Sequence, residues 1–276
     1  MKHMFITATA IALVASLGAC KKDAASETGA TSEAAKGTGI DGTWVVDINS
    51  VKFAGKPVEL MLKDGTYTCS SCIPALTVAA DGAFHAVTGR DYADEISVKI
   101  DSPTQVTTAA KKGGVAMGST VFSVSADGKT LTRSFTDTSI KGAKPVTGTS
   151  TLDRVGDAPA GAHAISGKWN PAKFENYSEE GLTSTYAATA DTLKMTGADG
   201  TSFDAKLDGS DAAIVGDPAG ATVAVTKTGD NAWHIVTKVK GKEVSTSDMT
   251  LDGDTMHTKT TDSASGNVTE YDAKRK

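Results

Sequence analysis

The chain has 276 residues, of which 39% are hydrophobic and 5% aromatic, and its formal net charge is −5. An acidic chain lacks the basic face that nucleic-acid binding requires, and it is poorly attracted to anionic lipid head groups. Composition therefore argues against nucleic acid as a partner, and it implies that attachment to a membrane must depend on apolar groups.

A short apolar segment at the N-terminus ends in the four residues Leu17–Cys20. Lys2 gives this segment a basic start, and the apolar run over residues 5–17 is too short to span a bilayer as a helix. A basic start, an apolar centre and small residues before a cysteine predict a secretory signal at 1–19. The end of the segment resembles the lipobox of bacterial lipoproteins. That resemblance implies cleavage before Cys20 and acylation of Cys20, which would attach the protein to a membrane.

The residues after Cys20 predict a lipidated, flexible tether over 20–39. They include no large apolar residue before residue 40, so the segment cannot offset its ordering entropy by burial. Its r.m.s. span would be roughly 25 Å. By resemblance to the usual sorting pattern of lipoproteins, Lys21 rather than an aspartate favours the outer membrane, facing the periplasm. Removing residues 1–19 takes away only Lys2 among the charged residues, which leaves 27 bases, 33 acids and a net charge of −6.

The remaining chain is an internal duplication. The segment Ile40–Trp44 (IDGTW) returns 125 residues later as Ile165–Trp169 (ISGKW), and Ser125–Leu131 returns at the same offset as Thr250–Met256. Between the copies lies a linker-like segment rich in glycine, alanine and proline. We therefore predict domain 1 at 40–156, a linker at 157–164 and domain 2 at 165–276, with two separately folding units divided near residue 160.

Each copy has the pattern of short antiparallel strands. Apolar residues alternate with polar ones, as in Ile96, Val98 and Ile100, and threonine, valine and serine are abundant between the turns. Asp-Gly pairs tolerate the positive φ of tight hairpin turns. They occur at residues 64–65, 81–82, 127–128, 199–200, 208–209 and 252–253. About eight strands in each copy predict an all-β fold, either a small meander barrel or a sandwich.

A Gly-x-Trp motif opens each copy, as Gly42–Trp44 and as Gly167–Trp169. This motif resembles the lipocalin signature, and residues 40–276 resemble bacterial lipoproteins with duplicated lipocalin-like domains. The resemblance implies two tandem lipocalin-like antiparallel meander β-barrels. It also implies that each tryptophan plugs the closed end of a barrel beneath a basic residue. Arg154 is the candidate for Trp44 in copy one, and Lys274 or Arg275 is the candidate in copy two.

Cys69 and Cys72 are separated by two serines. In an oxidising compartment a local disulfide is the first interpretation. A redox site would need a helix N-terminus to lower a thiol pKa, and this segment lies among strands. A zinc site would need two further ligands, of which only His85 is a candidate. Copy two has no cysteine, so the fold itself does not require the pair.

Leu131, Arg133 and Phe135 share one face of a predicted strand. If this face lines the barrel interior, Arg133 could pair with the anionic head group of a ligand. The alternative, which we favour from the sequence, is that the strand twists near the rim and Arg133 is solvated. Copy two has Thr258 at this position, and Trp233 there replaces Thr108 on an inner face, which predicts a different filling of the second interior.

Motifs typical of catalysis are missing from the sequence, including Gly-x-Ser-x-Gly, His-Glu-x-x-His and phosphate-binding glycine loops. We therefore expect no enzyme, no cofactor and no metal site. The leading hypothesis is an envelope lipoprotein that binds a small apolar or amphipathic ligand in a barrel. An interaction or scaffolding module with filled barrels is the alternative, and a thiol–disulfide enzyme comes third.

Overall fold

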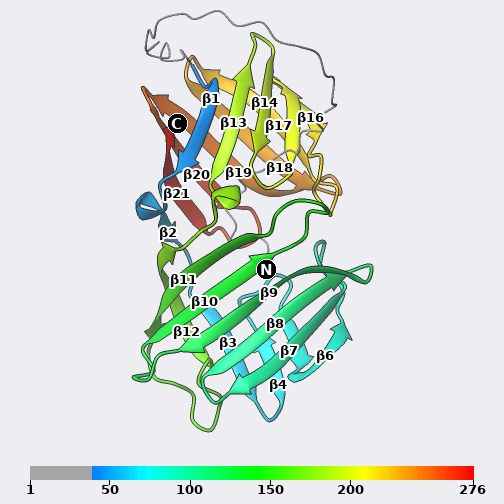
Figure 1. Ribbon diagram of the computed structural model, residues 1–276, viewed down its shortest axis with the longest axis vertical. Helices are drawn as coiled ribbons and strands as arrows, with labels where there is room; N and C mark the ends of the chain where they lie inside the picture. Colours follow the sequence, from blue (N-terminus) through cyan, green and yellow to red (C-terminus); the bar gives the residue numbers. More distant parts are fainter. Residues whose placement is uncertain (1–38) are drawn as a thin grey trace, which may run out of the picture.

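A computed structural model describes residues 39–276, which form β-strands almost throughout. The strands make two antiparallel sheets, and each sheet curls into a nearly closed barrel. Figure 1 shows the two barrels stacked along the long axis of the molecule. The predicted all-β fold with two tandem barrels is thus confirmed. Within residues 39–276, no helix has the length and apolar character needed to cross a membrane.

Barrel 1 is the sheet of ten strands with the order β5-β4-β3-β12-β11-β10-β9-β8-β7-β6. Its strands are β3 (Val58–Lys63), β4 (Thr66–Cys69), β5 (Leu76–Ala79), β6 (Asp81–Ala86), β7 (Glu95–Ser102), β8 (Gln105–Lys112), β9 (Val115–Val124), β10 (Thr130–Asp137), β11 (Val146–Val155) and β12 (Gly167–Glu175). These strands are contiguous in the sequence, from Val58 to Glu175.

Barrel 2 has the order β15-β14-β13-β1-β21-β20-β19-β18-β17-β16, with the short strand β2 paired to β21. Its strands are β1 (Gly42–Val46), β2 (Lys52–Ala54), β13 (Thr183–Ala188), β14 (Thr192–Gly197), β15 (Ser202–Lys206), β16 (Asp208–Ala213), β17 (Thr222–Gly229), β18 (Ala232–Val239), β19 (Lys242–Asp252), β20 (Thr255–Asp262) and β21 (Val268–Arg275). The 3-10 turns η2 (Ile48–Ser50) and η3 (Glu179–Gly181) follow β1 and β12. Each main sheet therefore has ten strands, two more than predicted.

The opening strands of the two sequence copies are exchanged between the barrels. Strand β1, from copy one, lies between β13 and β21 of copy two. Strand β12, from copy two, lies between β11 and β3 of copy one. The chain crosses between barrels at residues 55–57 and 176–182, so barrel 1 is inserted into barrel 2 between β2 and β13.

The sheets therefore divide the chain differently from the predicted domains at 40–156 and 165–276. The predicted linker at 157–164 connects β11 with β12, which are neighbouring strands of barrel 1. It packs onto that barrel, since the His163 amide donates to the Leu62 carbonyl at 2.8 Å and the His163 ring lies 2.7 Å from the Ser102 carbonyl. Its glycine and proline content marks a connection between strands rather than a joint between barrels.

Most Asp-Gly pairs lie in hairpin turns, but two do not. Asp64-Gly65 connects β3 to β4 with positive φ at both residues. Gly82 and Gly209 also have positive φ, yet they lie inside β6 and β16, where the strand register shifts. The prediction of hairpin turns at 81–82 and 208–209 is wrong, because the positive φ that Asp-Gly permits also suits a β-bulge.

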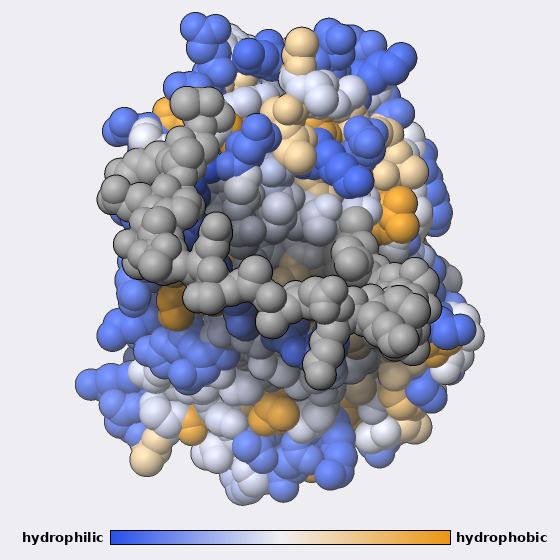
Figure 2. Space-filling view, turned by 45° about the horizontal axis from the view of Figure 1, so that its top comes forward, coloured by the Kyte–Doolittle hydropathy of each residue, from blue (hydrophilic) through white to orange (hydrophobic). Residues whose placement is uncertain are grey.

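The two barrels have separate apolar cores. One core gathers buried side chains of barrel 1 around Trp169, and the other gathers those of barrel 2 around Trp44. On the face drawn in Figure 2, apolar residues outside the grey atoms are scattered among hydrophilic ones. The strongly exposed Val115 and Val215 belong to different barrels. The apolar side chains of the described residues therefore gather mainly inside the barrels.

Candidate ligand-binding cavity in barrel 1

One end of barrel 1 is closed by Trp169, which is completely buried. Its indole N–H donates to the Ile165 carbonyl at 2.9 Å, and the Arg154 guanidinium lies 4.0 Å from the centre of its ring. Arg154 is held there by hydrogen bonds to the carbonyls of Gly128, Ser166 and Ala164 at 2.5, 2.7 and 2.7 Å. The arrangement combines a cation–π contact with satisfied guanidinium donors, and it seals this end.

Barrel 2 is closed in the same manner by Trp44. The indole N–H donates to the Ile40 carbonyl at 2.8 Å, and the Arg275 guanidinium lies 4.3 Å from the ring centre. The pairing of Arg154 with Trp44 that we expected within copy one is therefore not formed. Because β1 and β12 are exchanged, each tryptophan meets the arginine of the other copy. Of the two candidates in copy two, Arg275 rather than Lys274 stacks on a tryptophan.

Barrel 1 has a cavity at the end that faces barrel 2. This cavity of about 330 Å³ extends into the barrel, and its wall includes Leu131 and Arg133 of β10. Strand β10 begins beside the sealed end, since the Lys129 carbonyl just before it accepts from the Arg154 amide. Its inward residues run from Leu131 through Arg133 to Phe135, towards the open end. The remaining interior wall is largely apolar and includes Leu60, Tyr67, Phe122 and Leu152.

Arg133 therefore borders the cavity, and the solvated position at a rim that the sequence favoured is not found. Burial lowers the pKa of Arg133, and the nearby Tyr177 hydroxyl opposes that shift. Burial likewise raises the pKa of Tyr177, while the charge of Arg133 opposes it. Tyr177 also packs edge-on against Phe135, with ring centres 5.3 Å apart. It lies on the segment that crosses to barrel 2, so this crossing segment covers the open end of barrel 1.

Barrel 2 has different side chains at the positions that match the Arg133 region. Arg133 lies opposite Ser150 on the neighbouring strand, and the matching pair in barrel 2 is Thr258 opposite Tyr271. Trp233 is buried in the core of barrel 2 and borders none of the cavities described here, so the prediction that it lines a ligand site is not supported. It holds the second position of β18, where β8 has Val106, so the expected correspondence of Trp233 with Thr108 is wrong. Tyr271 and Trp233 are thus larger than their barrel 1 counterparts Ser150 and Val106, whereas Thr258 is smaller than Arg133.

The open end of barrel 1 faces barrel 2. The turn after β20 contributes Asp262, Ser265 and Asn267 to the wall of the 330 Å³ cavity. Two smaller cavities of about 140 and 150 Å³ lie nearby, one beside Phe135 and one between the barrels. Polar contacts join the two rims there. The Tyr92 hydroxyl lies 3.3 Å from Asp217 and Lys240 lies 3.0 Å from Asp91. A ligand in barrel 1 would therefore be enclosed partly by barrel 2.

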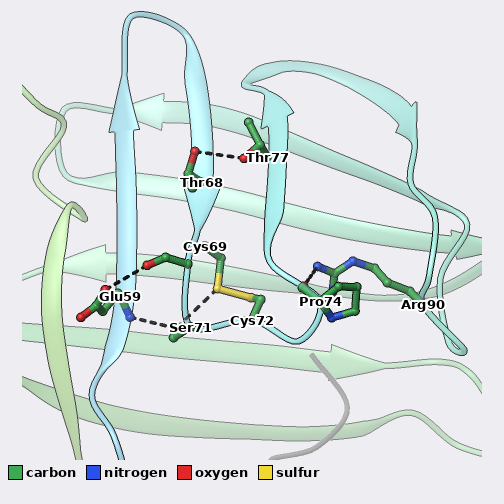
Figure 3. The surroundings of a disulfide bond; sticks show 9 residues. Glu59, Thr68, Cys69, Ser71, Cys72, Pro74, Thr77 and Arg90 are labelled. Atoms are coloured by element: carbon green, nitrogen blue, oxygen red, sulfur yellow. Dashed lines mark hydrogen bonds between the residues drawn. A yellow bond between two sulfur atoms is a disulfide. The ribbon is translucent and has the colours of Figure 1, made fainter. Parts of the chain in front are cut away.

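The sulfur atoms of Cys69 and Cys72 are 2.06 Å apart, a bonding distance, so the predicted local disulfide is present. It closes the turn between β4 and β5 (Figure 3). Both cysteines also border the cavity. Ser71 in the same turn accepts from the Glu59 amide at 2.9 Å. No α-helix begins at this turn, so it lacks the helix dipole that lowers the pKa of a redox-active thiol. The geometry therefore favours a structural disulfide over a redox-active one.

Changing Cys69 and Cys72 together to serine is expected to lower the free energy of unfolding by about 2 kcal/mol, because the disulfide restricts a four-residue loop in the unfolded chain. Urea denaturation of the oxidised wild type and the double variant measures the difference. Wild-type protein reduced with dithiothreitol should match the variant. Rapid exchange with glutathione, lost in the variant without loss of stability, would contradict a structural role and indicate thiol–disulfide chemistry.

The histidines of the strands lie on outer faces. His85 pairs with Asp81 at 2.9 Å, and His234 and His257 pair with Asp248 and Asp272 at 2.7 Å each. All three pairs are largely accessible to solvent, where such contacts contribute about 0–1 kcal/mol. Among residues 39–276, histidine, cysteine, aspartate and glutamate form no group of three or more suited to a metal ion. These pairs stabilise the sheet surface and define no site.

Comparison of the chain with protein-family models, curated proteins and solved structures finds no match. The candidate site therefore rests on its own geometry. The structure brings Leu131, Arg133 and the two cysteines to one cavity, while Phe135 borders the adjoining one. Sequence reasoning missed Tyr177 because it belongs to copy two and reaches the site only through the strand exchange. Cys20 lies outside the described residues.

Proposed function

We propose that this protein is a binding protein that holds a small apolar or amphipathic molecule inside barrel 1. The cavity of about 330 Å³ carries the proposal. Its volume falls at the lower end of the range for small-molecule sites, and a mostly apolar wall with few polar groups is typical of them. The resemblance of the two Gly-x-Trp motifs to the lipocalin signature supports the same function.

The N-terminal sequence supports a location of this protein in the bacterial cell envelope. Acylation of Cys20, implied by the lipobox resemblance, would anchor the chain to a membrane of the bacterial cell envelope. The residue after it, Lys21, favours the outer membrane, with the barrels in the periplasm. Several acyl chains on one cysteine give firm attachment, because each buried methylene contributes about 0.8 kcal/mol. Binding of an apolar molecule beside a membrane would suit storage or transfer of compounds poorly soluble in water.

Barrel 2 fits the second candidate function, that of an interaction or scaffolding module. Its core is occupied by Trp233, Met249 and Met256, all at most 4% exposed. A filled barrel has little room for a ligand. We therefore assign ligand binding to barrel 1 and a supporting role to barrel 2, whose turn at 262–267 helps to cover the cavity.

The proposal is tested by making barrel 1 resemble barrel 2. The double variant Arg133→Thr with Ser150→Tyr copies the pair Thr258–Tyr271, and it replaces a residue of the cavity wall while adding an aromatic ring at the neighbouring position. We expect protein lacking residues 1–20 to bind the neutral fluorescent probe N-phenyl-1-naphthylamine saturably, and the double variant to bind it about tenfold more weakly or not at all. Fluorescence titration measures both affinities, and native mass spectrometry of envelope-purified protein identifies co-purified molecules.

A matched control changes barrel 2 instead. Tyr271→Phe keeps the ring in place and should leave probe binding unchanged. Circular dichroism and thermal unfolding show whether the double variant remains folded. Saturable binding that is equal in the wild type and a folded double variant would place the ligand elsewhere. Absence of any saturable binding to the wild type would favour the filled-barrel alternative.

A further inference from the structure

Arg133 is not required by the barrel itself. The two barrels have matching strand pairs, and at the equivalent position barrel 2 has Thr258. Placing a guanidinium inside a barrel costs free energy unless polar or charged groups compensate for its lost hydration. Arg133 interacts with Tyr177 of the crossing segment, but a barrel of the same pattern forms with threonine at this position, so the arginine is a candidate for a role beyond the barrel itself.

The other charged groups that border the 330 Å³ cavity are Lys56 and Asp262. Lys56 is an exposed cation on the segment that crosses from β2 to β3. Asp262 is buried and binds within its own turn, where one carboxylate oxygen accepts from the Ser265 amide and hydroxyl at 2.7 Å each. The same oxygen accepts from the Ala264 amide at 3.1 Å. The cavity wall thus has two basic residues, Lys56 and Arg133, and one acidic residue, Asp262.

The apolar part of the wall lies beside Arg133. Leu131 and Leu152 pair across β10 and β11 at the next inward position towards the sealed end. Phe122 and Leu60 add buried apolar surface to the same cavity. A molecule that enters from the open end can therefore place an apolar chain against these residues while its head group stays near Arg133 and Tyr177.

We propose that the ligand of barrel 1 is an anionic amphiphile, whose carboxylate or phosphate is bound by Arg133 and whose apolar chain fills the cavity. This inference rests on the proposed binding function and names the chemical class of its ligand. A guanidinium offers several donors in a plane, which suits the oxygens of carboxylates and phosphates. The Tyr177 hydroxyl beside it can donate a further hydrogen bond to the same head group.

The test compares three ligands with the same ten-carbon chain, namely decanoate, decyl phosphate and decanol. Isothermal titration calorimetry measures their affinities for protein lacking residues 1–20, for Arg133→Met and for Arg133→Lys. We expect at least one of the two anions to bind the wild type more tightly than decanol does. Arg133→Met should weaken that anion roughly 10- to 100-fold, as for loss of a charge-assisted hydrogen bond, and leave decanol within about twofold. Arg133→Lys should restore part of the preference.

The outcomes separate this inference from the function on which it rests. Equal binding of decanol and both anions to the wild type would overturn the anionic head group while leaving a ligand-binding barrel. A preference that persists in Arg133→Met would overturn the role of Arg133. No binding of any of the three, together with no binding of the fluorescent probe, would overturn the binding function itself. Thr258→Val, at the equivalent position in barrel 2, is the matched control and should change none of the affinities.

Discussion

Replacing Trp169 with alanine is expected to unfold barrel 1, although Trp169 belongs to the second sequence copy. The side chain is fully buried, and Arg154 stacks on it at 4.0 Å. Removing a buried tryptophan costs about 3–5 kcal/mol, a large fraction of the stability of a typical domain. Hydrogen exchange read by mass spectrometry should show lost protection in β3–β11 and retained protection in β13–β21.

The reciprocal variant supplies the control for this experiment. Trp44→Ala should remove protection from β13–β21, because Trp44 lies beneath Arg275 in barrel 2. The two variants make opposite predictions for the same peptides, so a general loss of stability cannot imitate the expected pattern. Loss of protection in β13–β21 caused by Trp169→Ala would show that the opening strands are not exchanged.

A fragment of residues 57–178 is expected to fold alone and unfold cooperatively, because it holds every strand of barrel 1. The fragment 40–160 follows the sequence copies instead and lacks β12. Only β1 is available there to fill the gap between β3 and β11, and it has five residues against nine in β12. Several cross-strand pairs are then lost, each contributing about 0.2–1 kcal/mol. Fragment 40–160 should therefore be less stable by roughly 2 kcal/mol or more.

Urea denaturation followed by circular dichroism compares the two fragments, and analytical ultracentrifugation establishes that each is monomeric. The result depends only on which strand completes barrel 1. A stability of 40–160 equal to or above that of 57–178 would mean that each sequence copy closes its own barrel.

The sequence predicted the strands well because their causes are local. Alternation placed Ile96 and Val98 inside, and both are buried. It also placed Ile100 inside, but Ile100 is 42% exposed and lies near the end of β7, just before the pairing with β8 shifts register. A periodic pattern contains no information about where a bulge ends the buried part of a strand. The same limit explains the two Asp-Gly pairs that form bulges instead of turns.

No local sequence pattern indicates that β1 and β12 are exchanged between the barrels. Gly42–Trp44 and Gly167–Trp169 are near-equivalent, and either can donate its indole N–H to the isoleucine carbonyl four residues earlier in either barrel. The contacts that distinguish the two opening strands involve the segments that cross between the barrels. There Tyr177 packs on Phe135, and the Leu182 carbonyl accepts from the Val46 amide at 2.9 Å. These are contacts between residues far apart in the chain. They stabilise the exchanged arrangement, in which Tyr177 lies at the site.

Because barrel 1 is inserted into barrel 2, all strands of barrel 1 are synthesised before the last strands of barrel 2. A chain that leaves a ribosome or a translocation channel from its N-terminus presents β1 first, yet both neighbours of β1 come later, at Thr183–Ala188 and Val268–Arg275. Barrel 1 is complete once Glu175 has emerged. Strand β1, which carries Trp44, cannot pair with β21 until almost the whole chain has emerged. Until then, β1 can pair instead with β3 and β11 of barrel 1. In the folded protein β12 holds that place between β3 and β11, and β1 lies in the second barrel.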